Sequence, residues 1–308
     1  MREQSFPPVE EAESGQKLLR FLERRLSLPS NLLHRWIRTG QIRVNGGRSK
    51  PFARVEAGDV VRLPPFAEEL ANEAREASPP IEALPLPPLI GEWKGLLAYD
   101  KPRGLPAQPG AGHDDSLSSR LAANCADGAF RPAPCHRLDR DTTGVILVGA
   151  TFEALRSAQE ALAAGKIHKE YLAWVDGDWP HEGVRRLRGF LRKETRDNVT
   201  KTRVVPAGAP YSREAVCYVR PLLRRGGRSL LQIRLATGRG HQIRAQLAAC
   251  GYPVSGDGKY GKPGEMRLHS ARVILPDGHE FSCAPDWPAP WGTAELPPPL
   301  LDSLLPPE

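Results

Sequence analysis

An acidic, proline-rich stretch divides the chain into two parts that we expect to be separate domains. Residues 66–92 contain six glutamates against one arginine, and five prolines fall between positions 79 and 88. Prolines at this density favour an extended, semi-rigid chain that contributes little to a core. Alanine and glutamate at 67–77 predict one short helix there. We therefore expect 66–92 to be an interdomain linker with a folded unit on each side.

The part before the linker is compact and basic. Residues 16–65 carry eleven lysines and arginines against three acidic residues, a net charge of +8 in a 308-residue chain whose total is +7. Leucines at helical spacing predict a helix at 18–26, and a second helix runs from Ser30 or Asn31 as its N-cap to Gly40. Asn45-Gly46 indicates a tight turn between short strands. We expect a small α/β module here, preceded by a loose acidic tail at 1–15.

Clustered arginines can bind phosphates by charge alone, although they are also common on faces that are merely solvated. The path from the first helix through Arg38-Thr39-Gly40-Gln41-Ile42-Arg43-Val44-Asn45-Gly46 to Gly58-Asp59-Val60-Val61 resembles the small RNA-binding module first seen in a ribosomal small-subunit protein (S-four). The resemblance implies RNA binding through the second helix and the following turn. Its candidate RNA-binding residues are Arg35, Arg38 and Arg43.

The part after the linker, 93–287, is rich in strands and has only two or three clear helices. Helices are expected around Leu117–Ala122 and Phe152–Leu162, the second capped by Thr151. Short apolar or alternating runs predict the strands at 96–99, 145–148, 169–175, 215–220, 230–236 and 268–273. This pattern predicts an α+β domain. The proline-rich residues 288–308 are expected to form a trailing tail.

Two charged runs lie at the ends of these elements. His136-Arg137-Leu138-Asp139-Arg140-Asp141-Thr142-Thr143-Gly144 leads directly into an apolar strand, and its two arginines would keep the Asp139 carboxylate ionised. Alone, the run favours an ion pair that pins a loop, with Asp141 as a turn former. Gly238-Arg239-Gly240-His241-Gln242-Ile243-Arg244 gathers positive charge at a helix start, where an anion is favoured. An ordinary basic loop capping a helix explains this second run equally well.

Together and in order, six motifs resemble the RluA-type family of RNA pseudouridine synthases. They are Lys101-Pro102-x-Gly104, the run His136–Gly144, Lys169-x-Tyr171, Gly238-Arg239-x-His241-Gln242-Ile243-Arg244, Gly256-Asp257-x-x-Tyr260-Gly261 and Leu268-His269. The resemblance implies a mixed, largely antiparallel sheet with a central active-site cleft. It also implies an isomerase that converts uridine to pseudouridine without metal or other cofactor. Two residues depart from the family pattern: Thr143 replaces a usual serine, and Gln246 stands where many relatives have histidine.

The resemblance also assigns roles. Asp139 is the expected essential carboxylate, Arg244 its ion-pair partner, and Tyr171 the aromatic that packs on the uracil. The expected substrate-binding residues of this domain are Arg137, Arg140, Arg239 and His241. Alone, Tyr171 would be a core aromatic and Arg244 a helix-start arginine. The expected partner is RNA, first large-subunit (23S-type) ribosomal RNA and alternatively transfer RNA; the target base has to be flipped out. A non-catalytic RNA-binding or ribosome-assembly protein is the alternative from another class.

Composition argues against several other classes of protein: disulfide-rich, zinc-binding, membrane and secreted proteins. The five cysteines are widely spaced and form no C-x-x-C pair, which argues against a disulfide framework and a cysteine zinc site. No apolar run approaches the ~20 residues that a membrane-spanning helix needs. The polar N-terminus lacks the apolar core of a signal peptide. We therefore expect a cytoplasmic protein, and we expect it to be a monomer.

Overall fold

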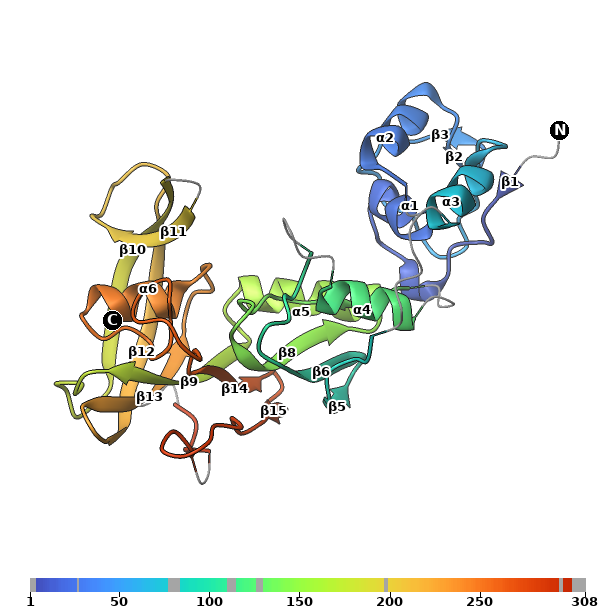
Figure 1. Cartoon of the computed structure of the whole chain (residues 1–308). Coiled ribbons are helices and arrows are strands. Elements are labelled where there is room, and N and C mark those ends of the chain that lie inside the picture. The colour runs from blue at the N-terminus through green and yellow to red at the C-terminus, as the bar shows by residue number, and fades with distance from the viewer. Residues whose placement is uncertain are drawn as a thin grey trace.

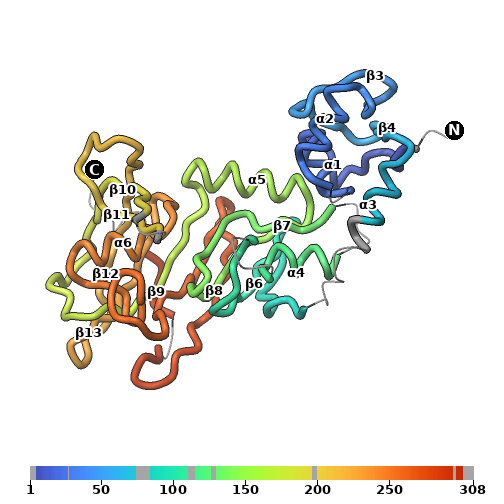
Figure 2. Tube along the Cα trace, turned by 45° about the horizontal axis from the view of Figure 1, so that its top comes forward, coloured from blue at the N-terminus to red at the C-terminus, as the bar shows by residue number. Residues whose placement is uncertain are grey.

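The computed structural model describes residues 4–26, 28–76, 84–109, 115–125, 130–196, 199–293 and 296–300. It contains a small N-terminal module and a larger domain built on one extended sheet (Figures 1 and 2). No helix within these ranges has the length and apolar character needed to cross a membrane.

The N-terminal module has its own core. Its helices are α1 (Leu18–Leu26), α2 (Ser30–Thr39) and α3 (Ala67–Glu76), with a short 3₁₀ turn at Glu11–Glu13, and its strands are β1 (Gln4–Ser5), β2 (Arg43–Val44), β3 (Gly47–Arg48) and β4 (Val61–Leu63). The strands pair in the order β1-β4-β2-β3. Leu18, Leu22, Leu33 and Trp36 are almost completely buried in this core. The two predicted helices and the Asn45-Gly46 turn are confirmed, the turn by positive φ angles of 50° and 78°.

Two local predictions for the N-terminal part were wrong. The N-cap of α2 is Pro29, which has no capping side chain, and the Leu32 amide donates to its carbonyl (3.0 Å). The expected loose tail is packed: β1 pairs with β4, Val9 is buried, and buried Glu13 forms an ion pair with Arg25. Strand β4 lies far from β1 along the chain, so no local pattern indicates the packing of this segment.

The expected linker is also shorter than 66–92. The predicted helix is present as α3, but Ala67 and Ala71 pack into the core of the module. Strand β5 (Leu89–Trp93) belongs to the large sheet. Ala67, Ala71 and the partly buried Leu70 give α3 an apolar face that packs on this core, although its glutamates suggest a solvated segment. Residues 77–83 of the predicted linker lie outside the described ranges.

The larger domain is an α+β fold on a mixed, largely antiparallel sheet, as predicted. The sheet order is β11-β10-β12-β13-β9-β14-β8-β6-β5, with β7 paired to β8 and β15 to β14. Among the strands described, β14 and β8 form the one parallel pair. The bounds are β6 (Leu96–Lys101), β7 (Ala133–Pro134), β8 (Thr143–Gly149), β9 (His168–Asp176), β10 (Arg185–Arg196), β11 (Val199–Val205), β12 (Arg213–Arg224), β13 (Arg228–Leu235), β14 (Leu268–Ile274) and β15 (Glu280–Ser282).

Three helices flank this sheet at different places (Figure 1). Helices α4 (Leu117–Asn124) and α5 (Phe152–Ala163) lie over the part that contains β6 and β8, and α6 (Gln242–Ala249) packs on β10 and β11. Thr151 caps α5 as predicted, because its hydroxyl accepts from the Ala154 amide (3.1 Å). The Arg24 guanidinium of the N-terminal module lies 4.5 Å from the centre of the Phe130 ring. The module therefore contacts the larger domain.

The C-terminal segment is not a trailing tail where the structure describes it. Leu300 is only 2% exposed. Its amide donates to buried Glu170 (2.6 Å) and its carbonyl accepts from Arg234 (2.9 Å). The carbonyls of Pro297 and Pro298 accept from Arg272 (3.1 Å) and Gln232 (2.8 Å). Charged side chains on one face of β9, β13 and β14 are thus satisfied by main-chain groups of 296–300, which hydropathy could not reveal.

Removing residues 296–308 should lower the free energy of unfolding by about 2.5–6 kcal/mol. One fully buried leucine contributes about 1.5–3 kcal/mol. Glu170 Oε1 would lose the Leu300 amide, while Oε2 keeps Arg272 and Gln232, and a buried acceptor left without its donor costs about 1–3 kcal/mol more. Urea denaturation of the full-length and shortened chains measures the difference. An unchanged midpoint would mean that this segment adds nothing to the fold.

Candidate active site

Asp139 lies on a tightly held loop between β7 and β8. Buried Lys101 donates to the carbonyls of Pro102 (2.8 Å), Leu105 (2.9 Å) and Arg140 (3.0 Å). The Gly104 amide donates to the Arg140 carbonyl as well (3.0 Å). Burial lowers the pKa of Lys101 to about 8, and the nearby acids only partly oppose this effect. The Lys101-Pro102-x-Gly104 motif therefore fixes the backbone next to Asp139.

Glycine is required where this loop enters β8. Gly144 has a φ of +99°, and a Cβ there would lie 2.3 Å from the Ser270 carbonyl oxygen on β14. The preceding bend is held by its backbone, since the Thr142 amide donates to the Asp139 carbonyl (3.1 Å). The Asp141 carboxylate instead pairs with Arg140 (3.2 Å) at the surface. The expectation that the Asp141 side chain supports the bend was therefore wrong.

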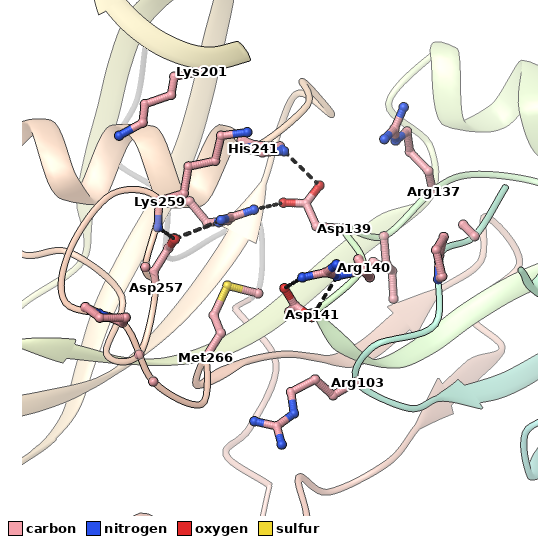
Figure 3. Close-up of a pocket in the computed structure, with 18 of the residues that line it drawn as sticks. Arg103, Arg137, Asp139, Arg140, Asp141, Lys201, His241, Asp257, Lys259 and Met266 are labelled. Atoms are coloured by element: carbon pink, nitrogen blue, oxygen red, sulfur yellow. Dashed lines mark hydrogen bonds and ion pairs between the residues drawn. The ribbon is translucent and has the colours of Figure 1, made fainter. Parts of the chain in front are cut away.

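A chain of ion pairs holds the Asp139 carboxylate (Figure 3). Arg244, in the first turn of α6, donates from Nη1 to Asp139 Oδ2 (2.9 Å). Its Nε and Nη2 donate to Asp257 (2.6 and 2.8 Å), whose side chain is fully buried. Burial opposes the charge on Arg244, but its hydrogen bonds with Asp257 and Asp139 outweigh burial and raise its pKa. Arg244 thus joins a buried acid to the acid of the loop.

His241 is the second basic residue, after Arg244, whose side chain lies close to the Asp139 carboxylate. It is the N-cap of α6 with a φ of +57°, and its Nε2 lies 3.9 Å from Asp139 Oδ1. Burial lowers the pKa of His241 despite the opposing effect of Asp139, so the neutral ring is favoured. Its Nδ1 lies 3.1 Å from the Tyr260 hydroxyl, which also accepts from the Thr202 amide of β11 (2.9 Å). Tyr260 therefore links the β10–β11 hairpin to His241.

Two hollows meet at Asp139. The outer hollow, about 1060 Å³, is lined by basic residues that include Arg103, Arg140, Lys201 and Lys259. The inner hollow, about 410 Å³, is lined by Tyr171, Leu268, Ile243 and residues of the 235–241 loop. Arg137, Leu138, Asp139, His241 and Arg244 line both. Asp139 therefore lies at the boundary between the two hollows.

Tyr171 lies on β9 and lines the inner hollow but not the outer one. It is 5% exposed and packs among residues of the main core. Burial raises the pKa of its hydroxyl, partly opposed by a hydrogen bond with Ser270. The ring is therefore a neutral, largely apolar surface beside Asp139, which suits contact with the face of a base.

The predicted basic residues of this domain fall at different places around the hollows. Arg137 is exposed and lines both hollows. Arg140 lines only the outer hollow, where it pairs with Asp141. Arg239 lines only the inner hollow, and its Nε donates to the Glu214 carbonyl (3.0 Å). In the view of Figure 3, Arg137 lies across Asp139 from Lys201 and Lys259.

The three predicted arginines of the N-terminal module do not form one cluster. Arg35 and Arg38 line a groove of about 600 Å³ with Arg48 and Lys50. Arg43 does not line it. Its guanidinium instead donates to the carbonyls of Gly40 (3.4 Å) and Gly46 (3.2 Å).

Sequence reasoning gave no role to several residues that the structure brings to Asp139. Asp257 and Lys101 both belong to motifs that the sequence analysis identified. Their burial could not be predicted, because residue type alone does not distinguish a buried acid or lysine from an exposed one. Lys201 lines the outer hollow from β11, and Lys259 lines it from the turn that follows Asp257. The signal available in the sequence was the motif Gly256-Asp257-x-x-Tyr260-Gly261. A side chain at Gly256 would clash with the Glu265 backbone, and one at Gly261 would clash with Pro253, so both glycines indicate a tightly packed turn around Asp257.

Comparisons with a family model and with individual proteins point to the same family. A model of the RNA pseudouridylate synthase family matches residues 95–249. The chain is 32% identical to ribosomal large subunit pseudouridine synthase C of Haemophilus influenzae over 255 residues, covering 82% of this chain and 78% of the relative. The protein of the same name from Escherichia coli (strain K12) is 33% identical over 254 residues, covering 81% and 77%.

Solved structures show the same fold. Human RNA pseudouridylate synthase domain containing 1 superposes with a TM-score of 0.53 at 22% identity, covering 67% of this chain and 85% of that one. Human RNA pseudouridylate synthase domain containing 4 superposes with a TM-score of 0.52 at 22% identity, covering 66% and 89%.

Proposed function

The chain belongs to the RNA pseudouridylate synthase family, and on that premise we propose that it isomerises specific uridines of large-subunit ribosomal RNA. One observation carries the proposal for this chain. The Asp139 carboxylate is held by Arg244 at 2.9 Å where an outer basic hollow meets an inner, tyrosine-lined one. The substrate class is taken from the relatives, two of which are named for the large ribosomal subunit.

The reaction breaks the bond between ribose C1′ and uracil N1, turns the ring, and joins C1′ to C5. The C5 proton is then released and N1 gains a proton, so no atoms are lost overall. Asp139 could attack the sugar, attack the base or abstract a sugar proton, and each route requires an ionised carboxylate. Arg244 supports that state, because a guanidinium that is itself anchored to Asp257 favours the charged form of Asp139.

The two hollows suggest how the uridine is bound. Its base would enter the inner hollow and pack on Tyr171 after it is flipped from the RNA, at a cost of a few kcal/mol. The basic residues of the outer hollow, including Arg140, Lys201 and Lys259, would contact the flanking phosphates. We assign Arg137 to the same RNA surface, because it lines both hollows.

Mapping pseudouridines at single-nucleotide resolution tests this function. Deleting the gene should remove one or a few pseudouridines from large-subunit ribosomal RNA, and the gene carrying the wild-type chain should restore them. Loss of pseudouridine only from transfer RNA would replace the proposed substrate. An unchanged map, together with no activity of the purified protein on unmodified transcripts, would favour a non-catalytic RNA-binding protein.

We also propose that the N-terminal module binds RNA phosphates along the groove lined by Arg35 and Arg38. Replacing both with alanine should raise KM by about tenfold or more with little change in kcat, because these contacts lie far from Asp139. The slope of log(kcat/KM) against log salt should become shallower by about 1.4–1.8, since each of the two lost phosphate contacts removes about 0.7–0.9. Arg20→Ala is the control, because Arg20 is 72% exposed on α1 outside the groove. Equal effects of both changes would argue against a specific groove.

A further inference from the structure

The inner hollow extends along β9 beyond Tyr171 to Lys169. Both side chains lie on the same face of the strand, about 7 Å apart for a two-residue step. This part of the hollow is also lined by His136, by Leu162 at the end of α5, and by Gly238 and Arg239. A ribose could span the distance from a base on Tyr171 to a group at Lys169.

Lys169 is a half-buried cation with no counter-charge. Within the described ranges, its ammonium makes no hydrogen bond and no ion pair. The adjacent acid, Glu170, is on the other face of β9, where it pairs with Arg272 (3.1 Å). Burial lowers the pKa of Lys169, so the charged amine is destabilised in the free protein. An anion bound beside it would reverse that effect.

The neighbouring loop leaves space for such an anion. A Cβ on Gly238 would lie 3.2 Å from the Lys169 Nζ, so a larger residue would crowd the ammonium. Arg239 follows directly, and only its Nε is hydrogen bonded among the residues described, to the Glu214 carbonyl. Its two terminal nitrogens thus keep the geometry that binds phosphate oxygens in pairs.

The charge balance of the inner hollow also favours an anion. Its lining includes Arg137, Lys169, Arg239 and Arg244, with Asp139 as its acidic member. Arg244 and Asp139 pair with each other, which leaves three basic side chains. We propose that Lys169 and Arg239 form a subsite for one backbone phosphate adjacent to the target uridine. This inference rests on the proposed function, since it identifies the anion as part of an RNA substrate.

Binding can be tested without turnover. Reductive ¹³C-methylation labels the lysines, and the Lys169 signal is identified as the one missing from Lys169→Arg. Titration with 5′-UMP or 3′-UMP should shift that signal and raise its apparent pKa, whereas uridine at equal concentration should leave it in place. An equal shift with uridine would place the base or sugar there, and no shift with either nucleotide would also overturn the subsite.

Kinetics on an unmodified large-subunit ribosomal RNA transcript provide a second test. Lys169→Met should raise KM about ten- to a hundredfold with kcat nearly unchanged, as expected for loss of one charge-assisted contact. The salt slope of log(kcat/KM) should become shallower by about 0.7–0.9, and Lys169→Arg should retain most of the wild-type KM. Exposed Lys166, which lines neither hollow, gives the control Lys166→Met. An unchanged KM in Lys169→Met, or a loss confined to kcat, would contradict phosphate binding.

The stability of the free protein separates this role from a structural one. Removing an uncompensated, half-buried charge should leave the urea midpoint of Lys169→Met unchanged or raise it. A lowered midpoint would mean that Lys169 supports the fold. Complete inactivity of the wild-type protein on every RNA would instead reject the proposed function, while the nucleotide titration would still report on the anion subsite.

Discussion

Asp139→Asn should abolish turnover while RNA binding persists. The amide occupies nearly the same volume and can still accept a hydrogen bond from Arg244, but it carries no charge and cannot act as nucleophile or base. Loss of a residue that takes part in the chemistry costs about 10⁴-fold or more in kcat. Release of tritium from RNA labelled at C5 of uridine measures turnover, and filter binding or gel shift measures affinity for the same RNA.

Asp141→Asn is the matched control for this change. Asp141 lies two residues away in the same loop, but its carboxylate pairs with Arg140, and both side chains are well exposed. An exposed ion pair contributes about 0–1 kcal/mol, so the Asp141 variant should keep most of its activity. Substantial turnover in Asp139→Asn, or equal inactivity of both variants, would refute the role proposed for Asp139.

Much of the fold followed from local pattern. Leucine spacing located α1, Gly40 marked the end of α2, Thr151 marked the start of α5, and short alternating runs located β9, β12 and β13. These features depend on neighbours within a few residues, so the sequence contains the information directly. The mixed, largely antiparallel character of the sheet came from family resemblance, because pairing between distant strands leaves little local trace.

The predictions of a loose N-terminal segment and a trailing C-terminal segment failed because their partners are distant in the chain. The segment 296–300 resembles a solvated tail, yet it satisfies Glu170 and Arg234 on the far face of the sheet. The site shows the same limit. Arg244 and Asp139 were identified through ordered motifs, but the buried Asp257 that anchors Arg244 was given no role. Residue type indicates which groups can ionise, and only the fold indicates which of them are buried together.

Arg244→Lys should lower kcat by about 10²–10³-fold while the protein stays folded. The planar guanidinium bonds both acids at once, with two nitrogens on Asp257 and one on Asp139. A lysine ammonium keeps the charge but cannot reproduce that fork, so it would pair with one acid and leave the other poorly held. Losing one well-placed electrostatic contact in a catalytic site costs about 2.7–4 kcal/mol, which corresponds to the expected loss of rate.

Asp257→Asn tests whether the anchor acts through Arg244. Asp257 does not line the inner hollow where the base is expected to bind, so its effect on kcat should be indirect. The double variant Arg244→Lys/Asp257→Asn should lose much less than the product of the single effects, because both changes release the same contact with Asp139. Arg156→Lys is the control, since it alters an exposed pair with Glu160 on α5. Independent, multiplicative losses would mean that Asp257 supports the fold and does not position Arg244.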